Sequence, residues 1–431
     1  MPPLSLRNVA LIAHVDHGKT TLVDAMLRVA GVFADHERPV DRVMDSSDQE
    51  RERGITILAK AASIGWKGTK INLVDTPGHA DFGGEVERAL ALVDGVLLLV
   101  DAADGPMPQT RYVLSKALER HLHAVVVVNK VDRSDARTAE VVDEIYELFF
   151  DLEAEDHHIE FPILSVIARK GLAIEGIGVP GPSDTLGPVL DAIVHALPAP
   201  QGDPDAPLQA LVTNLDASDY LGRLAIGRVI RGTLRAGERV ALLKGDGKPP
   251  IVRKIGTLMG FANLGRENVD ERQAGDLFVV AGFPDVGIGD TFSDTETIEV
   301  LPRLEVDEPV LRMTFGVNTS PLAGTEGTFV TSRQIRDRLE REVLGNVSIR
   351  IAETSSPEVT EVAGRGELQL SVLIESMRRE GFELQVSRPE VIVREVDGVK
   401  HEPVERVTVD VPEQYVGAVT QVVAPRKGRV T

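Results

Sequence analysis

The sequence AHVDHGKTT, residues 13–21, is the strongest indication of fold in this chain. It matches the phosphate-binding pattern G-x-x-x-x-G-K-[ST], except that Ala13 stands in place of the first glycine. It follows the strand-like run NVALIAH and opens the helical pattern TTLVDAMLRVAG, which is the context that this loop requires. There, backbone N–H groups and the helix N-terminus surround a phosphate. Gly-Lys-Thr alone is a weak signal, because ordinary strand-to-helix turns also contain it.

Composition places the chain among globular proteins. With 431 residues, 42% of them hydrophobic and 26% charged, it is long enough for about three domains. No apolar run approaches the roughly 20 residues of a membrane helix, and the N-terminus lacks a signal-peptide pattern. The absence of cysteine excludes disulfides and thiolate metal sites and fits a cytoplasmic protein. We expect no membrane partner and a monomer.

The charge balance bears on nucleic-acid partners. A net charge of -20 argues against a protein that grips nucleic acid mainly through its own field. We therefore predict no DNA partner, and an RNA-containing partner would need local basic groups. The candidates are Arg365, Arg378, Arg379, Arg426, Lys427 and Arg429, although an ordinary solvated face is the better interpretation of each set.

The order of sequence patterns predicts a multidomain α/β, β and α+β chain. Residues 1–200 contain continuously apolar runs (KINLVD, GVLLLVD, AVVVVN) separated by helical patterns near 107–121 and 136–150. Strands buried on both faces with helices between them indicate a doubly wound, mostly parallel sheet. The proline-rich stretch PAPQGDPDAP, residues 198–207, reads as a linker.

The later segments have different patterns of apolar residues and glycines. Residues 201–303 show short Val/Ile/Leu-rich runs between recurring glycines, which indicates a β-barrel. Residues 304–395 read as strand, helix, two strands, helix and strand, the split βαβ or ferredoxin-like order. In the second helix, an apolar stripe predicts core packing: Leu370, Leu373, Ile374 and Met377. Residues 396–431 begin a similar unit, with a strand VERVTVDV and a helix EQYVGAVTQVVAP. Because one strand and one helix bury too little to fold alone, we expect this unit to be truncated.

A second motif, LVDTPGH, supports a nucleotide site. Asp75 ends a strand-like run, where a carboxylate can hold Mg²⁺ opposite the phosphate-binding loop. Lys19 would reach the β- and γ-phosphates, and the Thr20 hydroxyl would bind Mg²⁺. Gly78 can bring its N–H to the γ-phosphate, and His79 follows where it can orient a water molecule. Alone, the motif could equally be a Pro-Gly turn.

A third motif, NKVD, residues 129–132, predicts the base. Asp132 can accept hydrogen bonds from N1–H and the exocyclic amine of guanine, a donor pair that adenine lacks. We expect Asn129 to tie this loop to the phosphate-binding loop and Lys130 to cover the base plane. The alternative is that this stretch only caps the start of the next helix.

The fourth motif, RERGITI, residues 51–57, ends a long polar stretch that starts near residue 35. Such a stretch is functional or disordered. Thr56 is the candidate that binds Mg²⁺ only when the γ-phosphate is present, which would make this segment a switch. Read alone, a solvated charged loop would be the better interpretation. The first three motifs, in this order and each at a strand end, predict a GTP/GDP site with Mg²⁺.

The four motifs together resemble the translational GTPases. The stretches FVTSRQIRDRLEREVLGNVSIRI and GRGELQLSVLIESMRREGFELQVSRPEVI resemble the TypA/BipA family in particular, over essentially the whole chain. The short interval from Asp132 to Ser165 leaves no room for the insertion of elongation factor G. The predicted split βαβ unit argues against elongation factor Tu, whose third domain is a barrel. A family member would continue beyond residue 431, which agrees with the expected truncation.

The resemblance implies roles for further residues. Val15 and Ile55 would form an apolar gate beside His79, and Asp16 would fix the loop and contact a monovalent cation. The second guanine loop of the family usually carries Ser-Ala, where this chain has Ile167 and Ala168. We expect weaker nucleotide binding, because the serine hydroxyl is absent. The predicted nucleotide contacts are His14, Val15, Asp16, His17, Gly18, Lys19, Thr20, Thr21, Gly78, Asn129, Lys130, Asp132, Ile167 and Ala168.

The resemblance also implies a partner and a reaction. The chain would hydrolyse GTP on the ribosome, in ribosome assembly or stress-adapted translation, with ribosomal contacts mostly in the absent C-terminal region. Two alternatives stay open: a GTP-dependent binding module with negligible turnover in this form, and a factor of the elongation factor G class. NKVD argues against a P-loop ATPase.

Overall fold

The computed structural model describes residues 5–32, 48–218, 220–245, 247–303, 308–346, 348–396, 398–404, 407, 409 and 411–429. The chain divides into two compact units on either side of Ile392 and Val393. In the described parts of the chain, no helix is long and apolar enough to cross a bilayer.

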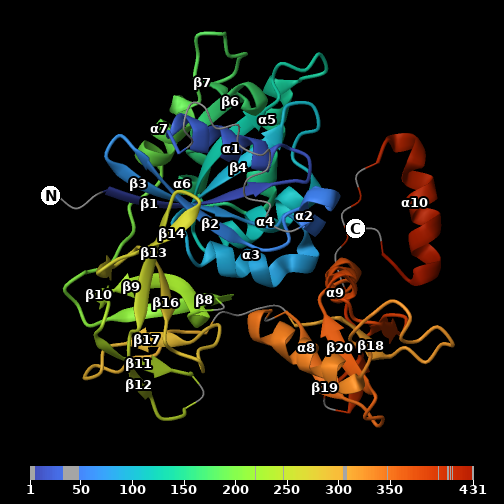
Figure 1. Ribbon diagram of the computed structural model, residues 1–431. Helices are drawn as coiled ribbons and strands as arrows, with labels where there is room; N and C mark the ends of the chain where they lie inside the picture. Colours follow the sequence, from blue (N-terminus) through green and yellow to red (C-terminus); the bar gives the residue numbers. More distant parts are fainter. Residues whose placement is uncertain are drawn as a thin grey trace. The chain divides into compact units, whose positions relative to one another are not determined.

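The larger unit begins with a seven-stranded sheet in the order β2-β3-β1-β4-β5-β6-β7 (Figure 1). The neighbouring pairs from β3 to β6 are parallel, whereas β2 and β7 add antiparallel edges. Every residue of β4 is buried, as its continuous apolarity predicts. The strands are β1 (Ser5–Ala13), β2 (Lys60–Trp66), β3 (Thr69–Asp75), β4 (Gly95–Asp101), β5 (His123–Asn129), β6 (Ile163–Ile167) and β7 (Leu172–Glu175).

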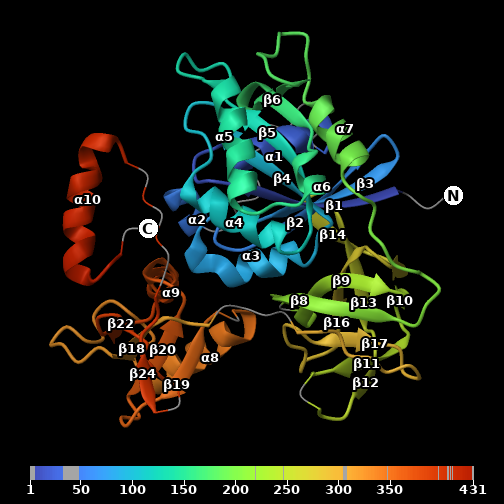
Figure 2. The same ribbon diagram turned by 180° about the vertical axis from the view of Figure 1, so that it is seen from behind.

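Helices cover both faces of this sheet (Figures 1 and 2). One core packs α1 and α7 against the strands, and another packs α3, α4 and α5 against the opposite face. The doubly wound prediction is therefore confirmed. The helices are α1 (Lys19–Val29), α2 (Asp48–Arg53), η1 (Ala80–Phe82), α3 (Gly83–Leu90), α4 (Pro108–Leu118), α5 (Thr138–Asp151), α6 (Asp156–Ile159), η2 (Ala168–Lys170) and α7 (Gly187–Ala196).

The next part of this unit is β-rich, as predicted. Eight antiparallel strands follow the path β12-β11-β17-β8-β9-β16-β13-β14, and β10 pairs with β15. Its core includes Phe278, Phe283 and Phe292. The strands are β8 (Gln209–Ser218), β9 (Gly222–Arg231), β10 (Thr233–Arg235), β11 (Arg239–Leu243), β12 (Ile251–Lys254), β13 (Thr257–Ala262), β14 (Gly265–Asn268), β15 (Glu271–Gln273), β16 (Leu277–Ala281) and β17 (Thr291–Ser293).

The last part of the larger unit has the split βαβ strand order, β19-β20-β18-β21, with β22 also paired to β18. The predicted apolar stripe of its second helix packs inward, with Leu370, Leu373 and Met377 buried. The elements are β18 (Leu311–Val317), α8 (Ser332–Gly345), β19 (Arg350–Glu353), β20 (Val359–Gly364), α9 (Glu367–Arg379), β21 (Leu384–Val386) and β22 (Glu390–Val391).

The smaller unit contains a hairpin and a helical segment. Of the strand predicted over VERVTVDV, residues 404–411, residues 405, 406, 408 and 410 lie outside the described residues, and the described ones lie in no strand. The helix predicted after it is present. The elements are β23 (Arg394–Val396), β24 (Val399–His401), η3 (Glu413–Tyr415), α10 (Val416–Val423) and η4 (Ala424–Arg426). The proposed domain boundaries at 200, 303 and 395 stay predictions.

Candidate functional site

The phosphate-binding loop connects β1 to α1 at the carboxyl ends of the parallel strands, where ligands of such sheets bind. Gly18 is the N-cap of α1 and has φ 98°, a conformation that favours glycine. A Cβ on Gly78 would lie 2.8 Å from the carbonyl oxygen of Ala13. Gly78 therefore allows the second motif to approach the backbone of the loop at Ala13.

A cavity of about 270 Å³ opens at this loop. It brings together most of the predicted phosphate, magnesium and water-orienting residues. The lining residues are Ala13, His14, Val15, Asp16, Gly18, Lys19, Thr20, Thr21, Gly54, Ile55, Thr56, Gly78, His79 and Lys130.

Lys19, Asp75 and Thr56 meet at one side of the loop. Lys19 Nζ lies 2.9 Å from Asp75 Oδ1, and Thr56 Oγ1 donates to Asp75 Oδ2 over 3.2 Å. Lys19 also donates to the carbonyl of Thr76. Oxygens about 3 Å apart suit neighbouring positions around Mg²⁺, whose metal–oxygen distances are about 2.1 Å. The hydroxyl and carboxylate set therefore fits magnesium.

Asn129 holds two loops at once. Its Nδ2 donates to the carbonyl of His17 over 2.9 Å, and its Oδ1 accepts the N–H of Ala168 over 3.0 Å. Because Asn129 is buried, both hydrogen bonds are shielded from water. The structure thus joins the predicted base loops to the phosphate-binding loop through one side chain.

Asp132 and Ile167 lie beyond the cavity lining. Lys170 Nζ lies 2.7 Å from Asp132 Oδ2. This hydrogen bond lowers the pKa of the Asp132 carboxyl. Ile167 is buried at the end of β6, so its side chain serves the core. Lys170 is a neighbour that the motif did not reveal.

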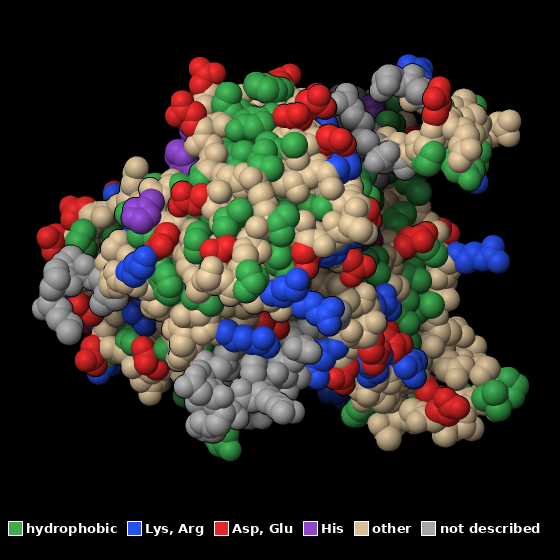
Figure 3. All heavy atoms as spheres, turned by 90° about the horizontal axis from the view of Figure 1, so that it is seen from above, with side chains coloured by type: hydrophobic (Ala, Val, Ile, Leu, Met, Phe, Trp, Pro, Cys, Tyr) green, Lys and Arg blue, Asp and Glu red, His purple; other side chains and the backbone are tan. Residues whose placement is uncertain are grey.

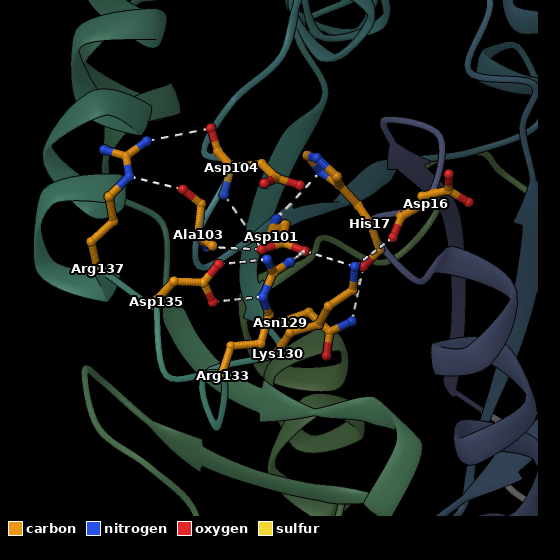
Figure 4. A network of polar contacts seen from close by, with 10 residues as sticks. All are labelled: Asp16, His17, Asp101, Ala103, Asp104, Asn129, Lys130, Arg133, Asp135 and Arg137. Atoms are coloured by element: carbon orange, nitrogen blue, oxygen red, sulfur yellow. Dashed lines mark hydrogen bonds and ion pairs between the residues drawn. The ribbon is translucent and has the colours of Figure 1, made fainter.

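Asp101 is the centre of a polar network that the sequence reading missed (Figure 4). Lys130 Nζ and Arg133 Nη1 lie 2.7 and 3.3 Å from its Oδ2, and the N–H of Ala103 donates to Oδ1 over 2.8 Å. Burial opposes its ionisation, but the hydrogen bonds from Lys130, Ala103 and Asp104 outweigh it and lower the Asp101 pKa. An acidic residue ending an apolar run, as at Asp75, was the available signal.

Lys130 links this network to the phosphate-binding loop. Its Nζ also donates to the carbonyl of Asp16 over 2.7 Å. Asp16 has φ 64° and Lys130 φ 62°, so both backbones are left-handed. One lysine therefore connects two loops whose backbones are held in uncommon conformations.

The histidines of the loop are kept neutral. His17 is buried, and its Nδ1 accepts the N–H of Asp101 over 3.3 Å. Burial, with His14 as a neighbouring base, lowers the pKa of His17 to about 4. Burial also lowers the pKa of His14. His17 therefore acts inside the fold, behind the cavity, rather than among its lining residues.

His79 lies at the cavity beside Asp81. Its Nδ1 is 3.2 Å from Asp81 Oδ1, and the N–H of Leu368 donates to Asp81 Oδ2 over 2.8 Å. Burial opposes ionisation of Asp81, but its hydrogen bonds with His79, Leu368 and Gln369 outweigh that effect and lower its pKa. No motif of the sequence pointed to Asp81.

A histidine cluster lies elsewhere, at His121, His157 and His158, with one ligand atom of each within 4.8 Å of the others. His158 Nδ1 accepts the N–H of Glu155 as part of a helix cap. His158 therefore has a structural role at the start of α6.

Comparison with known proteins gives independent evidence of a GTP-binding domain. The family model "Elongation factor Tu GTP binding domain" matches residues 4–199, and "Elongation factor Tu domain 2" matches residues 222–293. The "Large ribosomal subunit assembly factor BipA" of Bacillus subtilis is 51% identical over 425 residues, which are 99% of this chain and 69% of that protein.

Two further relatives carry the same name. The Synechocystis protein is 52% identical, and the match covers 99% of this chain and 71% of that protein. The Escherichia coli K12 protein is 51% identical, and the match covers 98% and 69%. With a GTP-binding domain at its N-terminal end and this similarity along nearly all of its length, the chain belongs to the BipA family.

Proposed function

We propose that this chain binds and hydrolyses GTP and acts on the ribosome, in assembly of the large subunit. The observation that carries the proposal is the convergence of Lys19, Thr56 and His79 on one cavity at the phosphate-binding loop. The names of the relatives support the ribosomal role, because they are called large ribosomal subunit assembly factors. A role in stress-adapted translation stays a prediction.

The chemistry follows from the charges around the cavity. Phosphoryl transfer to water needs positioning and neutralisation of charge more than covalent help. Lys19 and the loop N–H groups supply positive charge, and Mg²⁺, when bound, adds more; Thr20, Thr56 and Asp75 would hold it. The monovalent cation near Asp16 stays a prediction.

His79 would orient the attacking water. Val15 and Ile55 line the same cavity, where they would act as the apolar gate. Asp132 would read the guanine, after its carboxylate exchanges one contact with Lys170 for the base. Asn129 keeps that loop in register with the phosphate loop.

The charge distribution limits how the chain meets RNA. On the face shown in Figure 3, acidic and basic side chains lie side by side. Arg378 and Arg379 both contact Glu375, at 2.8 and 2.7 Å. These pairs leave less free positive charge for phosphates than the sequence suggests.

The test is GTP hydrolysis by the chain with and without large ribosomal subunits. We expect stimulated turnover, and we expect His79→Ala to abolish the stimulation while GTP affinity stays within a few-fold. The control is His195→Ala, an exposed histidine on α7. GTP binding without stimulated turnover would favour a binding module, and equal competition by ATP would refute guanine recognition.

A further inference from the structure

Asp81 lies two residues after His79, in the short helix η1, and its two carboxylate oxygens face different partners. Oδ1 is 3.2 Å from His79 Nδ1. Oδ2 accepts the N–H of Leu368 over 2.8 Å, across 287 positions of sequence. One side chain therefore touches both the candidate water-orienting residue and the first turn of α9.

The contact with His79 sets the chemistry of its ring. Nδ1 has two neighbours from Asp81, the carboxylate oxygen and the backbone N–H, each at 3.2 Å. The carboxylate favours a proton on Nδ1, which leaves the lone pair of Nε2 free to accept a hydrogen bond from water. The backbone N–H favours the opposite tautomer. Because a hydrogen bond to an ionised carboxylate is about twice as strong as one between neutral groups, the carboxylate decides the tautomer and makes the ring an acceptor at Nε2.

The contact with α9 supplies a cap that the helix lacks. The N-cap residue of α9 is Gly366, and no side chain of its own caps the helix. The first N–H groups of a helix need acceptors, and negative charge is favourable there. A Cβ on Gly366 would lie 2.2 Å from Asp81, so only glycine leaves room for the carboxylate.

The same helix also touches the segment that precedes Thr56. Gln49 of α2 donates to Ser376 Oγ over 2.8 Å, and Arg379 pairs with Glu52. Ile57, Phe82 and Val372 form a small buried apolar cluster between these contacts. Helix α9 is therefore held against both sides of the cavity, and Asp81 is its link to His79.

We propose that Asp81 is the positioning residue of the GTP site, through which the seating of α9 sets the orientation and tautomer of His79. The proposal rests on the function proposed above. When α9 is seated, the carboxylate is divided between Leu368 and His79, and Nε2 is presented to the water. When α9 moves away, Asp81 loses one of its two partners and His79 loses its fixed position.

Asp81→Asn tests whether one carboxylate must contact both Leu368 and His79. An asparagine has one acceptor oxygen, and if that oxygen accepts the Leu368 N–H, the amide nitrogen can only donate to His79 Nδ1. The substitution therefore keeps a contact with His79 but favours the tautomer that carries its proton on Nε2. At saturating GTP and ribosomal subunits we expect kcat to fall about 10- to 100-fold, the usual cost of removing an orienting partner. KM and GTP affinity should stay within about threefold, because Asp81 does not line the cavity.

The control is Asp151→Asn, whose carboxylate contacts Arg111 on the protein surface. It should leave kcat unchanged. If Asp81→Asn kept wild-type kcat while wild type was stimulated normally, the positioning role would be wrong and the proposed function would stand.

Gly366→Ala tests the same contact from the other side. The added methyl would displace the carboxylate, so we expect a fall in kcat similar to that of Asp81→Asn. Gly345→Ala is the matched control, because a Cβ there meets nothing within 4 Å. The double variant Asp81→Asn/Gly366→Ala should be no slower than the slower single variant. If the fold-losses in kcat of the two single variants multiplied in the double variant, the two substitutions would act independently. That result would contradict the proposed link from α9 through Asp81 to His79.

A readout without turnover separates the two proposals. Nitrogen-15 NMR of the full chain, at a pH where imidazole is neutral, should give His79 with its proton on Nδ1. Asp81→Ala should move the proton to Nε2, since only the backbone N–H then faces Nδ1. An unchanged tautomer would refute the role of Asp81 even if the chain proved inactive on ribosomes.

Discussion

The side-chain nitrogen of Asn129 lies 2.5 Å from the point that a Cβ of Gly18 would occupy. The same nitrogen donates to the carbonyl of His17. The asparagine therefore packs onto the backbone of the phosphate-binding loop. Two separate motifs of the sequence restrict each other at this point, and both bear on nucleotide binding.

Gly18→Ala should abolish tight GTP binding. The methyl would meet Asn129 Nδ2, and the φ of 98° strains any residue but glycine. Gly31→Ala is the control, because Gly31 has φ 73° but a Cβ there meets nothing within 4 Å. We expect that control to lose about 1 kcal/mol of stability from backbone strain alone, without loss of GTP affinity. Titration with a fluorescent guanine nucleotide measures the affinities; equal losses in both variants would exclude the steric clash.

Asn129→Ala should weaken both folding and binding. It leaves the carbonyl of His17 and the N–H of Ala168 without their partner, and each unpaired buried group costs about 1–3 kcal/mol. We expect a lower Tm and at least a tenfold loss of GTP affinity. Asn268→Ala, on the exposed strand β14, should change neither. A variant with normal affinity would show that the loops keep their register by other means.

His17 should make stability depend on pH. Its pKa is about 4 in the folded chain and 6.5 as the reference value, so the unfolded chain takes up the proton first as pH falls. The stability present above pH 6.5 is lost between about pH 6.5 and 4. From pH 7.5 to 5.5 the loss is about 1.4 kcal/mol.

His17→Asn should remove that part of the dependence. It keeps an acceptor for the N–H of Asp101 but cannot titrate in this range. The neighbouring groups His14, Asp101 and Asp104 remain in both proteins and cancel in the comparison. Thermal unfolding at the two pH values measures the difference between wild type and variant. An identical pH dependence in both would mean that His17 has the same pKa in the folded and the unfolded chain.

Local sequence patterns predicted the helices and strands, because the spacing of apolar residues within one element determines which of its faces is buried. The continuously apolar run 95–101 predicted a strand buried on both faces, and β4 is buried throughout. The stripe of Leu370, Leu373 and Met377 predicted the inner face of α9. The motif NKVD predicted that Asn129 would reach the phosphate-binding loop, and both lie at the carboxyl ends of strands in one sheet, β5 and β1, with β4 between them.

The contacts that sequence reading missed join distant segments. Nothing around Asp81 indicates that Leu368 will meet it, because no periodicity relates the two positions. Likewise Lys170 meets Asp132 only after β6 is laid beside β5. Asp101 carried a visible signal, an acid at a strand end, but its three-way pairing depends on two loops that fold around it.

The contacts at both ends of α9 have a thermodynamic consequence. Gln49 and Glu52 contact Ser376 and Arg379 near one end of the helix, and Asp81 contacts Leu368 at the other. If the nucleotide also binds better to one seating of this helix than to another, any molecule that prefers one seating changes the affinity for nucleotide. Linkage is reciprocal, so the nucleotide changes the affinity for that molecule by the same factor. Helix α9 would then couple binding at a distant surface to binding of nucleotide in the cavity, and the coupling free energy is the same in both directions.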